Sequence, residues 1–208
     1  MKLYYGTTSP YVRKVQVTAI ELGLSEQIDF ENTLPWESET TLGNINPLGK
    51  IPALVTDQGQ LIHDSRVICE YFDALAGGGI VIPSANNIDA RMACLTLDSM
   101  ADGMMEAMIL VYSELVRRPK DLHWNYWEDR QRGKVDKGLD ELEKIAASFD
   151  PENLQLGQIS LACAVAWLDF REQVLDIDFR NGRPALSEWF AIIDARPSFR
   201  QTVPYTSP

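Results

Sequence analysis

The spacing of apolar residues over residues 1–33 predicts a strand, a helix and a second strand. Residues 2–5 form a short strand-like run. Ser9-Pro10 then places a hydroxyl at a helix N-cap and a proline at the first helical position. Apolar residues recur at helical spacing from there to Gly23, where the helix should stop. Residues 28–33 alternate weakly between apolar and polar side chains, as a strand does.

The next segment predicts two further strands and a helix. Ile51-Pro52 opens a strand over residues 53–56, residues 57–60 form a turn, and a second strand ends near His63. Asp64-Ser65 then begins a helix, whose apolar face is Val67, Ile68, Tyr71, Phe72 and Leu75. The predicted order for residues 1–76 is therefore β-α-β, a connector, and β-β-α.

A change of composition divides the chain in two. Three successive glycines at 77–79 end the second helix, and residues 77–87 have the composition of a linker. Strand patterns vanish after it, and long helical patterns cover residues 88–116, 122–148, 159–175 and 184–195. We therefore predict an α/β domain over residues 1–76, a linker over 77–87 and an all-helical domain over 88–208.

Charge and composition exclude several classes of function. With 30 acidic against 19 basic residues, the net charge of −11 repels a polyanion, so nucleic acid is not an expected partner. The sequence has neither a long apolar run nor a signal-peptide pattern, which predicts a cytoplasmic protein that does not act in a membrane. The three cysteines and two histidines show no metal-ligand spacing, so we expect no metal, no disulfide framework and no dithiol redox centre.

Three short motifs in the first domain carry candidate chemistry, and each has a structural alternative. The first is Ser9, whose alternative role is a plain helix cap worth about 1 kcal/mol. Arg13 and Lys14, however, lie near the positive end of the same helix dipole, an unfavourable place for cations unless an anion is expected nearby. This placement argues for a functional role of the Ser9 hydroxyl.

The second motif is the segment 46–54, Asn-Pro-Leu-Gly-Lys-Ile-Pro-Ala-Leu. If the Ile51-Pro52 bond is cis, the backbone N–H and C=O of Ile51 can turn outward and pair with another extended peptide. An ordinary trans proline at a strand start is the alternative. The third motif, Asp64-Ser65, offers a hydroxyl and free N–H groups for a carboxylate and an acidic side chain for an ammonium group, and its alternative is again a helix cap. Together the three motifs supply the contacts that a short thiol peptide needs.

These motifs, in this order and followed by an all-helical domain, resemble bacterial cytosolic glutathione S-transferases over essentially the whole chain. The segments that carry the resemblance are residues 9–14 (Ser-Pro-Tyr-Val-Arg-Lys), residues 46–54, Asp64-Ser65 and the ending Arg196-Pro197-Ser198-Phe199. The resemblance implies a thioredoxin-like N-terminal domain, a helical C-terminal domain, glutathione as co-substrate, a homodimer and a role in detoxification.

The resemblance places the catalytic hydroxyl at Ser9. This hydroxyl would donate to the sulfur of glutathione and, with the positive end of its helix, stabilise the reactive thiolate. Some members use a serine two residues before the proline, where this chain has Thr8, and other classes use a tyrosine near the end of the first strand, where it has Tyr5. Ser9 is our first choice. A cysteine at this position would favour reduction chemistry, so its absence argues against a thiol transferase.

The resemblance also implies a set of glutathione-binding residues. Ile51, beside a cis Pro52, would pair with the cysteinyl backbone, and Lys50 would approach the glycyl carboxylate. Asp64 and Ser65 would hold the γ-glutamyl end. The family more often has Glu or Gln at the position of Asp64, so a shorter carboxylate must reach the same ammonium group.

The helical domain would contribute the hydrophobic substrate site. Methionines and an aromatic residue on the helix over 88–116 offer a flexible, polarizable surface for a small electrophile, although core or dimer packing is the alternative for methionines at this spacing. The expected site residues are Tyr11, Met104, Met105, Met108 and Tyr112. Asp102 would reach the γ-glutamyl ammonium group of the other subunit.

Ser160 and Cys163 mark a departure from the family pattern. Members usually have Ser or Thr followed three residues later by Asp, a capping pair, whereas this chain has Cys163 at the second position. Because a thiol is a poor acceptor, we expect the cap to be left to Ser160 alone, at a cost of about 1 kcal/mol. Cys163 lies on an apolar run and is expected to be buried and inert rather than reactive.

Two functions of different classes fit the sequence. The leading hypothesis is a dimeric glutathione transferase that conjugates glutathione to small hydrophobic electrophiles. The alternative is a non-catalytic member of the family, an interaction protein that keeps the fold without the chemistry. The presence of Ser9, Pro52 and Ser65 favours the enzyme.

Overall fold

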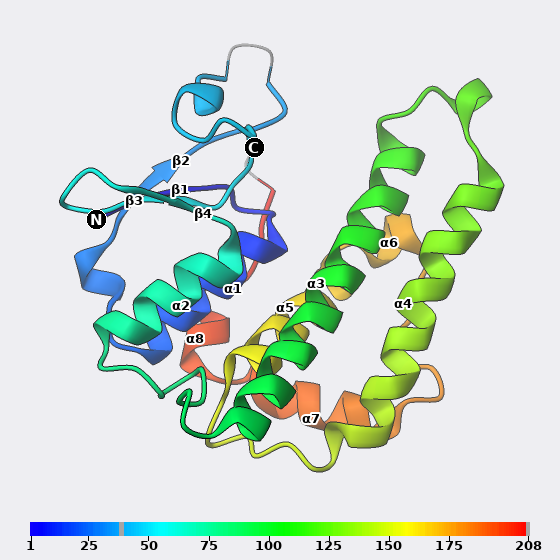
Figure 1. Cartoon of the computed structure of the whole chain (residues 1–208). Coiled ribbons are helices and arrows are strands. Elements are labelled where there is room, and N and C mark those ends of the chain that lie inside the picture. The colour runs from blue at the N-terminus through cyan, green and yellow to red at the C-terminus, as the bar shows by residue number, and fades with distance from the viewer. Residues whose placement is uncertain (38–39, 207–208) are drawn as a thin grey trace. The chain divides into compact units, whose positions relative to one another are not determined.

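The computed structural model describes residues 1–37 and 40–206, which divide into two compact units (Figure 1). The first unit comprises Met1–Cys94 together with the chain from Pro197 onward, and the second comprises Leu95–Arg196. None of the helices in the described ranges has the length and hydrophobicity that a membrane span requires.

The first unit is built on a four-stranded mixed sheet. Its strands are β1 (Lys2–Tyr5), β2 (Asp29–Asn32), β3 (Ala53–Val55) and β4 (Leu61–His63), in the order β2-β1-β3-β4. β1 runs parallel to β2, whereas β3 is antiparallel to both β1 and β4. Two 3₁₀ turns, η1 (Ser25–Gln27) and η2 (Leu42–Asn44), lie in the connections. With α1 (Pro10–Glu21) and α2 (Ser65–Leu75), the predicted β-α-β and β-β-α order is confirmed.

The core of this unit lies between the sheet and its two helices. α1 and α2 lie side by side on one face of the sheet (Figure 1). Leu3 and Leu54 are paired neighbours on β1 and β3, and both are fully buried. Ile68 and Phe72, one helical turn apart on α2, are also fully buried. The helical period of α2 and the pairing of the strands thus bring their apolar residues into one core.

Residues 77–82 are anchored to α2, which differs from the linker expected here. The carboxylate of Asp73 accepts hydrogen bonds from the backbone N–H groups of four successive residues: Gly79 at 2.9 Å, Ile80 at 3.0 Å, Val81 at 2.8 Å and Ile82 at 3.4 Å. Val81 and Ile82 are buried. The glycines at 77–79 all have positive φ, so they turn the chain back over its own helix.

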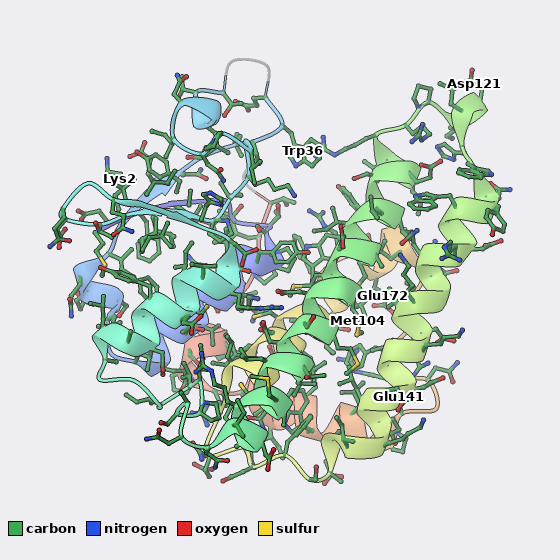
Figure 2. The ribbon with its side chains drawn as sticks, in the orientation of Figure 1. Lys2, Trp36, Met104, Asp121, Glu141 and Glu172 are labelled. Atoms are coloured by element: carbon green, nitrogen blue, oxygen red, sulfur yellow. The ribbon has the colours of Figure 1, made fainter. Side chains whose placement is uncertain are left out.

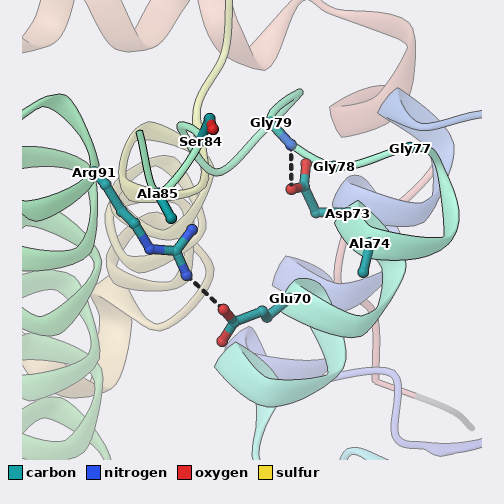
Figure 3. Close-up of a pocket in the computed structure, with 9 residues that line it drawn as sticks. All are labelled: Glu70, Asp73, Ala74, Gly77, Gly78, Gly79, Ser84, Ala85 and Arg91. Carbon is teal, nitrogen blue, oxygen red and sulfur yellow. Dashed lines mark hydrogen bonds and ion pairs between the residues drawn. The ribbon is translucent and has the colours of Figure 1, made fainter. Parts of the chain in front are cut away.

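The same region contains a pocket of about 320 Å³, bounded by α2, the glycine run and the start of α3 (Ile88–Val116) (Figure 3). An ion pair between Glu70 and Arg91, with 2.5 Å between oxygen and nitrogen, joins the two helices across it. Arg91 also donates to the carbonyl oxygen of Pro83 at 3.1 Å. The start of α3 therefore belongs to the first unit.

The end of the chain completes the first unit through Arg13. α8 (Pro197–Arg200) follows the second unit in sequence but packs against α1. The guanidinium of Arg13 donates to the Phe199 carbonyl oxygen at 3.0 Å and to Thr202 Oγ1 at 3.3 Å, and it lies 5.2 Å from the centre of the Phe199 ring. Arg13 near the helix start therefore interacts with groups of the chain itself, whereas the sequence suggested an anion as its partner.

The second unit is helical throughout its described secondary structure. It contains most of α3, then η3 (Lys120–Leu122), α4 (Asn125–Ala146), α5 (Leu156–Phe170), α6 (Glu172–Leu175) and α7 (Pro184–Asp194). Every residue of α5 from Leu156 to Leu168 is buried, as expected of a helix that is apolar on all sides. The predicted helix over 159–175 begins earlier, at Leu156, and is divided at Arg171.

The start of α5 is capped differently from the expectation. Gln155 and Gln158 form a reciprocal capping box, in which the Gln155 N–H donates to Gln158 Oε1 at 2.8 Å. Ser160 lies inside the helix and donates to Asp98 Oδ1 of α3 at 2.6 Å, with both residues fully buried. The prediction that Ser160 is the N-cap is wrong, because the helix begins before it. Cys163 is buried, as predicted.

Carboxylates hold the ends of two helices in the second unit. Glu114 of α3 accepts from the Trp124 N–H at 2.8 Å and from Arg118 Nε at 2.7 Å, which fixes the connection to α4. The hydrogen bond from Trp124, together with Arg118, lowers the pKa of Glu114 although burial opposes the shift. Glu143 of α4 accepts from the N–H groups of Ala185 and Leu186, the first turn of α7.

Candidate functional site

Ser9 occupies the N-cap of α1 and keeps its hydroxyl hydrogen available. Its backbone is extended, with φ −83° and ψ 122°, and its Oγ accepts a hydrogen bond from the Val12 N–H at 3.3 Å. No described residue accepts a hydrogen bond from this hydroxyl. A half-buried O–H at the positive end of a helix is suited to stabilise an anion such as a thiolate.

The other two candidate hydroxyls lie shortly before Ser9, one at the end of β1 and one on its connection to α1. Thr8 directly precedes Ser9, and Tyr5 ends β1 with its ring packed edge-on against Phe30, 5.6 Å between centres. Tyr11 lies in the first turn of α1 and is half-buried. The structure therefore brings Tyr5, Thr8 and Ser9 into one short segment, and the choice of Ser9 remains a prediction.

The Ile51–Pro52 peptide bond is cis, which confirms the condition set by the second motif. Pro52 is buried, and Ile51 is half-buried. Within the described residues, neither the N–H nor the C=O of Ile51 forms a hydrogen bond. Gly6 approaches Ile51 closely, because a Cβ at Gly6 would lie 2.8 Å from Ile51 Cδ1. The result is a backbone donor and acceptor that can pair with an extended peptide.

Asn46 organises the loop that leads to this peptide bond, a role that sequence reasoning missed. Its side chain is buried, donates to the Lys50 carbonyl oxygen at 2.7 Å and accepts from the Leu48 N–H at 3.1 Å. The signal was an asparagine directly before Pro-Leu-Gly, a sequence typical of an Asx turn. Lys50 itself is exposed, so its ammonium group is accessible to a ligand.

Asp64 and Ser65 stand at the start of α2 in different roles. Asp64 is the N-cap and accepts from the Arg66 N–H at 2.9 Å, so Ser65 is the first helical residue and not a cap. Asp64 has φ +75°, an unusual conformation for a residue with a side chain, and such conformations gather at functional sites. Ser65 is 4% exposed and Asp64 is exposed, so the pair presents a carboxylate beside a nearly buried hydroxyl.

The residues expected to form the electrophile site divide into two groups. Met104, Met105 and Met108 are 3%, 0% and 0% exposed. Met104 of α3 points toward α4 and fills the space beside Gly138, where a Cβ would lie 2.6 Å from its sulfur (Figure 2). These methionines therefore pack in the second unit, as the alternative interpretation stated, and their contact with an electrophile stays a prediction. Tyr112 is half-buried, with its ring 5.9 Å from that of Trp167.

Two further predictions concern Asp102 and metal binding. Asp102 is half-buried in α3, and its contact with a second subunit stays a prediction. Among residues 1–37 and 40–206, no group of three or more histidine, cysteine or acidic side chains could hold a metal ion.

Comparisons with known proteins decide the family. The family model for the glutathione S-transferase N-terminal domain matches residues 8–75, which include Ser9, the cis-proline loop and the start of α2. The model for the glutathione S-transferase C-terminal domain matches residues 125–191. The chain belongs to the glutathione S-transferase family. The sheet with its two helices is thus the thioredoxin-like domain of that family, and the second unit is its helical domain.

Relatives of similar length support this membership along the whole chain. The Escherichia coli (strain K12) protein named "Uncharacterized GST-like protein YibF" is 32% identical over 209 residues, with 98% of each chain covered. A glutathione transferase family member from Pseudomonas fluorescens Pf-5, solved with bound glutathione, is 38% identical with a TM-score of 0.90 and 99% of each chain covered. A structure of a Pf-5 family member with bound S-(propanoic acid)-glutathione is 38% identical with a TM-score of 0.86, covering 99% of this chain and all of that one.

Proposed function

We propose that this chain is a glutathione transferase in which Ser9 stabilises the thiolate of glutathione for attack on small electrophiles. The observation that carries the proposal is the Ser9 hydroxyl at the N-terminus of α1, whose oxygen accepts from Val12 and whose hydrogen is free to donate. A cytoplasmic location is part of the proposal. The bound glutathione in the Pseudomonas relative supports the same substrate for this chain.

Glutathione would be held along its length by the first unit. The uncommitted N–H and C=O of Ile51 would pair with the cysteinyl backbone, as in strand addition. Ser65 would donate to the γ-glutamyl carboxylate, and Asp64 would accept from its ammonium group, since both stand at the start of α2. Lys50, exposed after the Asn46 turn, would meet the glycyl carboxylate.

The chemical step is a nucleophilic attack by sulfur. The thiol loses its proton to water, and the Ser9 O–H donates a hydrogen bond to the resulting thiolate without itself ionising. The sulfur then uses a lone pair to form a carbon–sulfur bond. Either a leaving group departs with its bonding electrons, or the adjacent carbon of an unsaturated electrophile takes a proton from water. No metal is needed for this sequence.

The proposed enzyme is a homodimer. Val67 of α2, with Ile88 and Met92 of α3, are 48%, 56% and 45% exposed, and the ion pair between Glu70 and Arg91 holds the two helices together beside them. Exposed apolar side chains on one unit favour contact with a second copy. Asp102 would then reach the γ-glutamyl ammonium group bound by the partner subunit.

Retention on immobilised glutathione and conjugation of 1-chloro-2,4-dinitrobenzene test the proposal together. The enzyme should be retained, be released by free glutathione, and form the conjugate faster than the uncatalysed reaction. Retention without conjugation of any electrophile would favour the non-catalytic family member. Absence of retention and of conjugation would contradict glutathione as the substrate.

A further inference from the structure

Arg171 is an arginine of the second unit whose side chain has no acidic partner among the described residues. Arg118, Arg132, Arg180 and Arg183 of this unit all form ion pairs with acidic side chains. The side chain of Arg171 forms no hydrogen bond or ion pair with any described residue, and its Nε is fully buried without an acceptor. Because the Nε is buried, an anion from outside the chain can meet only the terminal N–H groups of this half-buried side chain, which have no acceptor among the described residues.

Three aromatic rings hold the Arg171 guanidinium in place. Its central carbon lies 4.3 Å from the centre of the Phe170 ring, 4.7 Å from that of Tyr112 and 5.9 Å from that of Trp167. Arg171 stands at the junction of α5 and α6, where its N–H donates to the carbonyl oxygens of Trp167 and Leu168. Its backbone is therefore fixed, and cation–π contacts orient the side chain without using its N–H donors.

The Tyr112 ring, whose centre lies 4.7 Å from the guanidinium carbon, carries a second uncommitted donor. The Tyr112 hydroxyl has no hydrogen-bond partner among the described residues, although the Tyr112 ring packs against both Trp167 and Arg171. Tyr112 and Arg171 come from different helices, so the arrangement joins two donors and flat apolar surface at one place. A planar fork of N–H groups beside a phenolic O–H matches a carboxylate, and the rings match an unsaturated or aromatic body.

We propose that Arg171 and Tyr112 bind the carboxylate of a small aromatic or unsaturated acid, so that the preferred electrophile of this enzyme is a carboxylic acid. The assignment of this acid as the electrophile rests on the proposed function. The carboxylate site itself rests only on the geometry around Arg171.

The first test compares two electrophiles that differ only at the carboxyl group, 4-chloro-3-nitrobenzoate and its uncharged methyl ester. Each kcat/KM is divided by the rate constant of the uncatalysed reaction with glutathione, and the acid-to-ester ratio is then compared between variants. Arg171→Met should lower this ratio about tenfold, and Arg171→Lys, which keeps the charge but not the planar fork, should lower it less. Arg130→Met removes an exposed arginine of α4 and should leave the ratio unchanged. An unchanged ratio in Arg171→Met would mean that Arg171 only packs against the rings.

The second test measures binding without chemistry. Calorimetric titration with 3-nitrobenzoate, which cannot react, should give weaker binding in Arg171→Met by about tenfold and in Tyr112→Phe by a smaller factor. Thermal melting of each variant checks that the fold is intact. If the wild type conjugates neither electrophile but binds 3-nitrobenzoate through Arg171, the proposed function fails and the carboxylate site stands. Equal affinity in wild type and Arg171→Met, or no binding by either, overturns the site.

Discussion

Ser9 Oγ accepts a hydrogen bond from the Val12 N–H at 3.3 Å, so the proposed catalytic hydroxyl is also the cap of α1. The two roles use different parts of the group, because the cap uses an oxygen lone pair and the thiolate would use the hydrogen. A substitution can therefore remove both roles or only one of them. This separation shapes the first prediction.

Ser9→Ala should lower kcat/KM for conjugation by about 10²–10³-fold, since the donor to the thiolate is lost. It should also lower the free energy of unfolding by about 1 kcal/mol, because the Val12 N–H loses its acceptor. Ser9→Asp keeps a cap but has no donor at neutral pH, so it should melt near the wild type and conjugate no better than Ser9→Ala. Steady-state kinetics and urea unfolding measure the two effects.

The neighbouring hydroxyls provide the controls for this prediction. Thr8→Val and Tyr5→Phe should retain most of the conjugation activity. If either variant is inactive while Ser9→Ala keeps full turnover, the catalytic hydroxyl has been assigned to the wrong residue.

Ser65→Ala and substitutions of Asp64 should affect glutathione binding with different costs in stability. Asp64 caps α2 and Ser65 does not, so Ser65→Ala should weaken glutathione affinity about tenfold without the loss of a helix cap. Asp64→Ala should lose both the ammonium contact and about 1 kcal/mol of stability, whereas Asp64→Asn keeps a capping oxygen and should melt close to the wild type. Both effects on binding should appear mainly in KM.

Calorimetry with glutathione decides this prediction. Normal affinity in Ser65→Ala and Asp64→Asn would remove both residues from the binding site. A loss of stability in Ser65→Ala as large as in Asp64→Ala would contradict the assignment of the cap.

Local patterns were enough to predict the order of elements and the candidate loops. The alternation of strands, the Ser9-Pro10 helix start and the glycine run depend on residues close together in sequence. Two helix starts had competing candidates for the cap. Asp64 stands next to Ser65, and the sequence did not say which of the two is the cap; at α5, Gln155 with Gln158 is a weaker capping signal than Ser160, which was wrongly chosen. Sequence spacing alone could not rank these alternatives.

Long-range partners could not be predicted in the same way. Arg13 was interpreted as a sign of an anion because its acceptor, Phe199, lies 186 residues away. Arg171 lies outside every motif, and its lack of a partner is visible only when the rings of Tyr112 and Phe170 are in place. The composition of residues 77–87 suggested a linker, because nothing in the local sequence shows that Asp73 binds this segment. That contact depends on a turn at the glycines that only the folded backbone provides.

Asp73→Asn should destabilise the protein by about 2–3 kcal/mol. The carboxylate accepts from four backbone N–H groups, and an amide would offer one oxygen and turn its own NH₂ toward donors. Glu70→Gln, in the same pocket, removes only a surface ion pair and should cost less than about 1 kcal/mol. Urea unfolding of the two variants measures the difference, and equal losses would show that Asp73 does not hold the segment.

The stabilisation from Glu114 should depend on pH. Its folded-state pKa is lowered, so the contribution is fully present above the ordinary pKa of a glutamic acid and is lost as the pH falls through the lowered value. Unfolding of wild type and Glu114→Gln between about pH 7 and pH 3 should give a stability difference that shrinks toward acid. Glu141→Gln, which alters an exposed pair with Lys144, is the control. A difference that stays constant would show that Glu114 does not act through its charge.

The contact between Arg13 and Phe199 ties the folding of the first unit to the completion of the chain. During synthesis α1 leaves the ribosome early, whereas the carbonyl oxygen that receives its arginine is made 186 residues later. Until then, the guanidinium of Arg13, which is 5% exposed in the finished protein, lacks the Phe199 carbonyl oxygen as an acceptor. A fragment that ends at Cys94 would contain the whole sheet and still lack this acceptor, so the thioredoxin-like domain reaches its final packing only after the helical domain has been made.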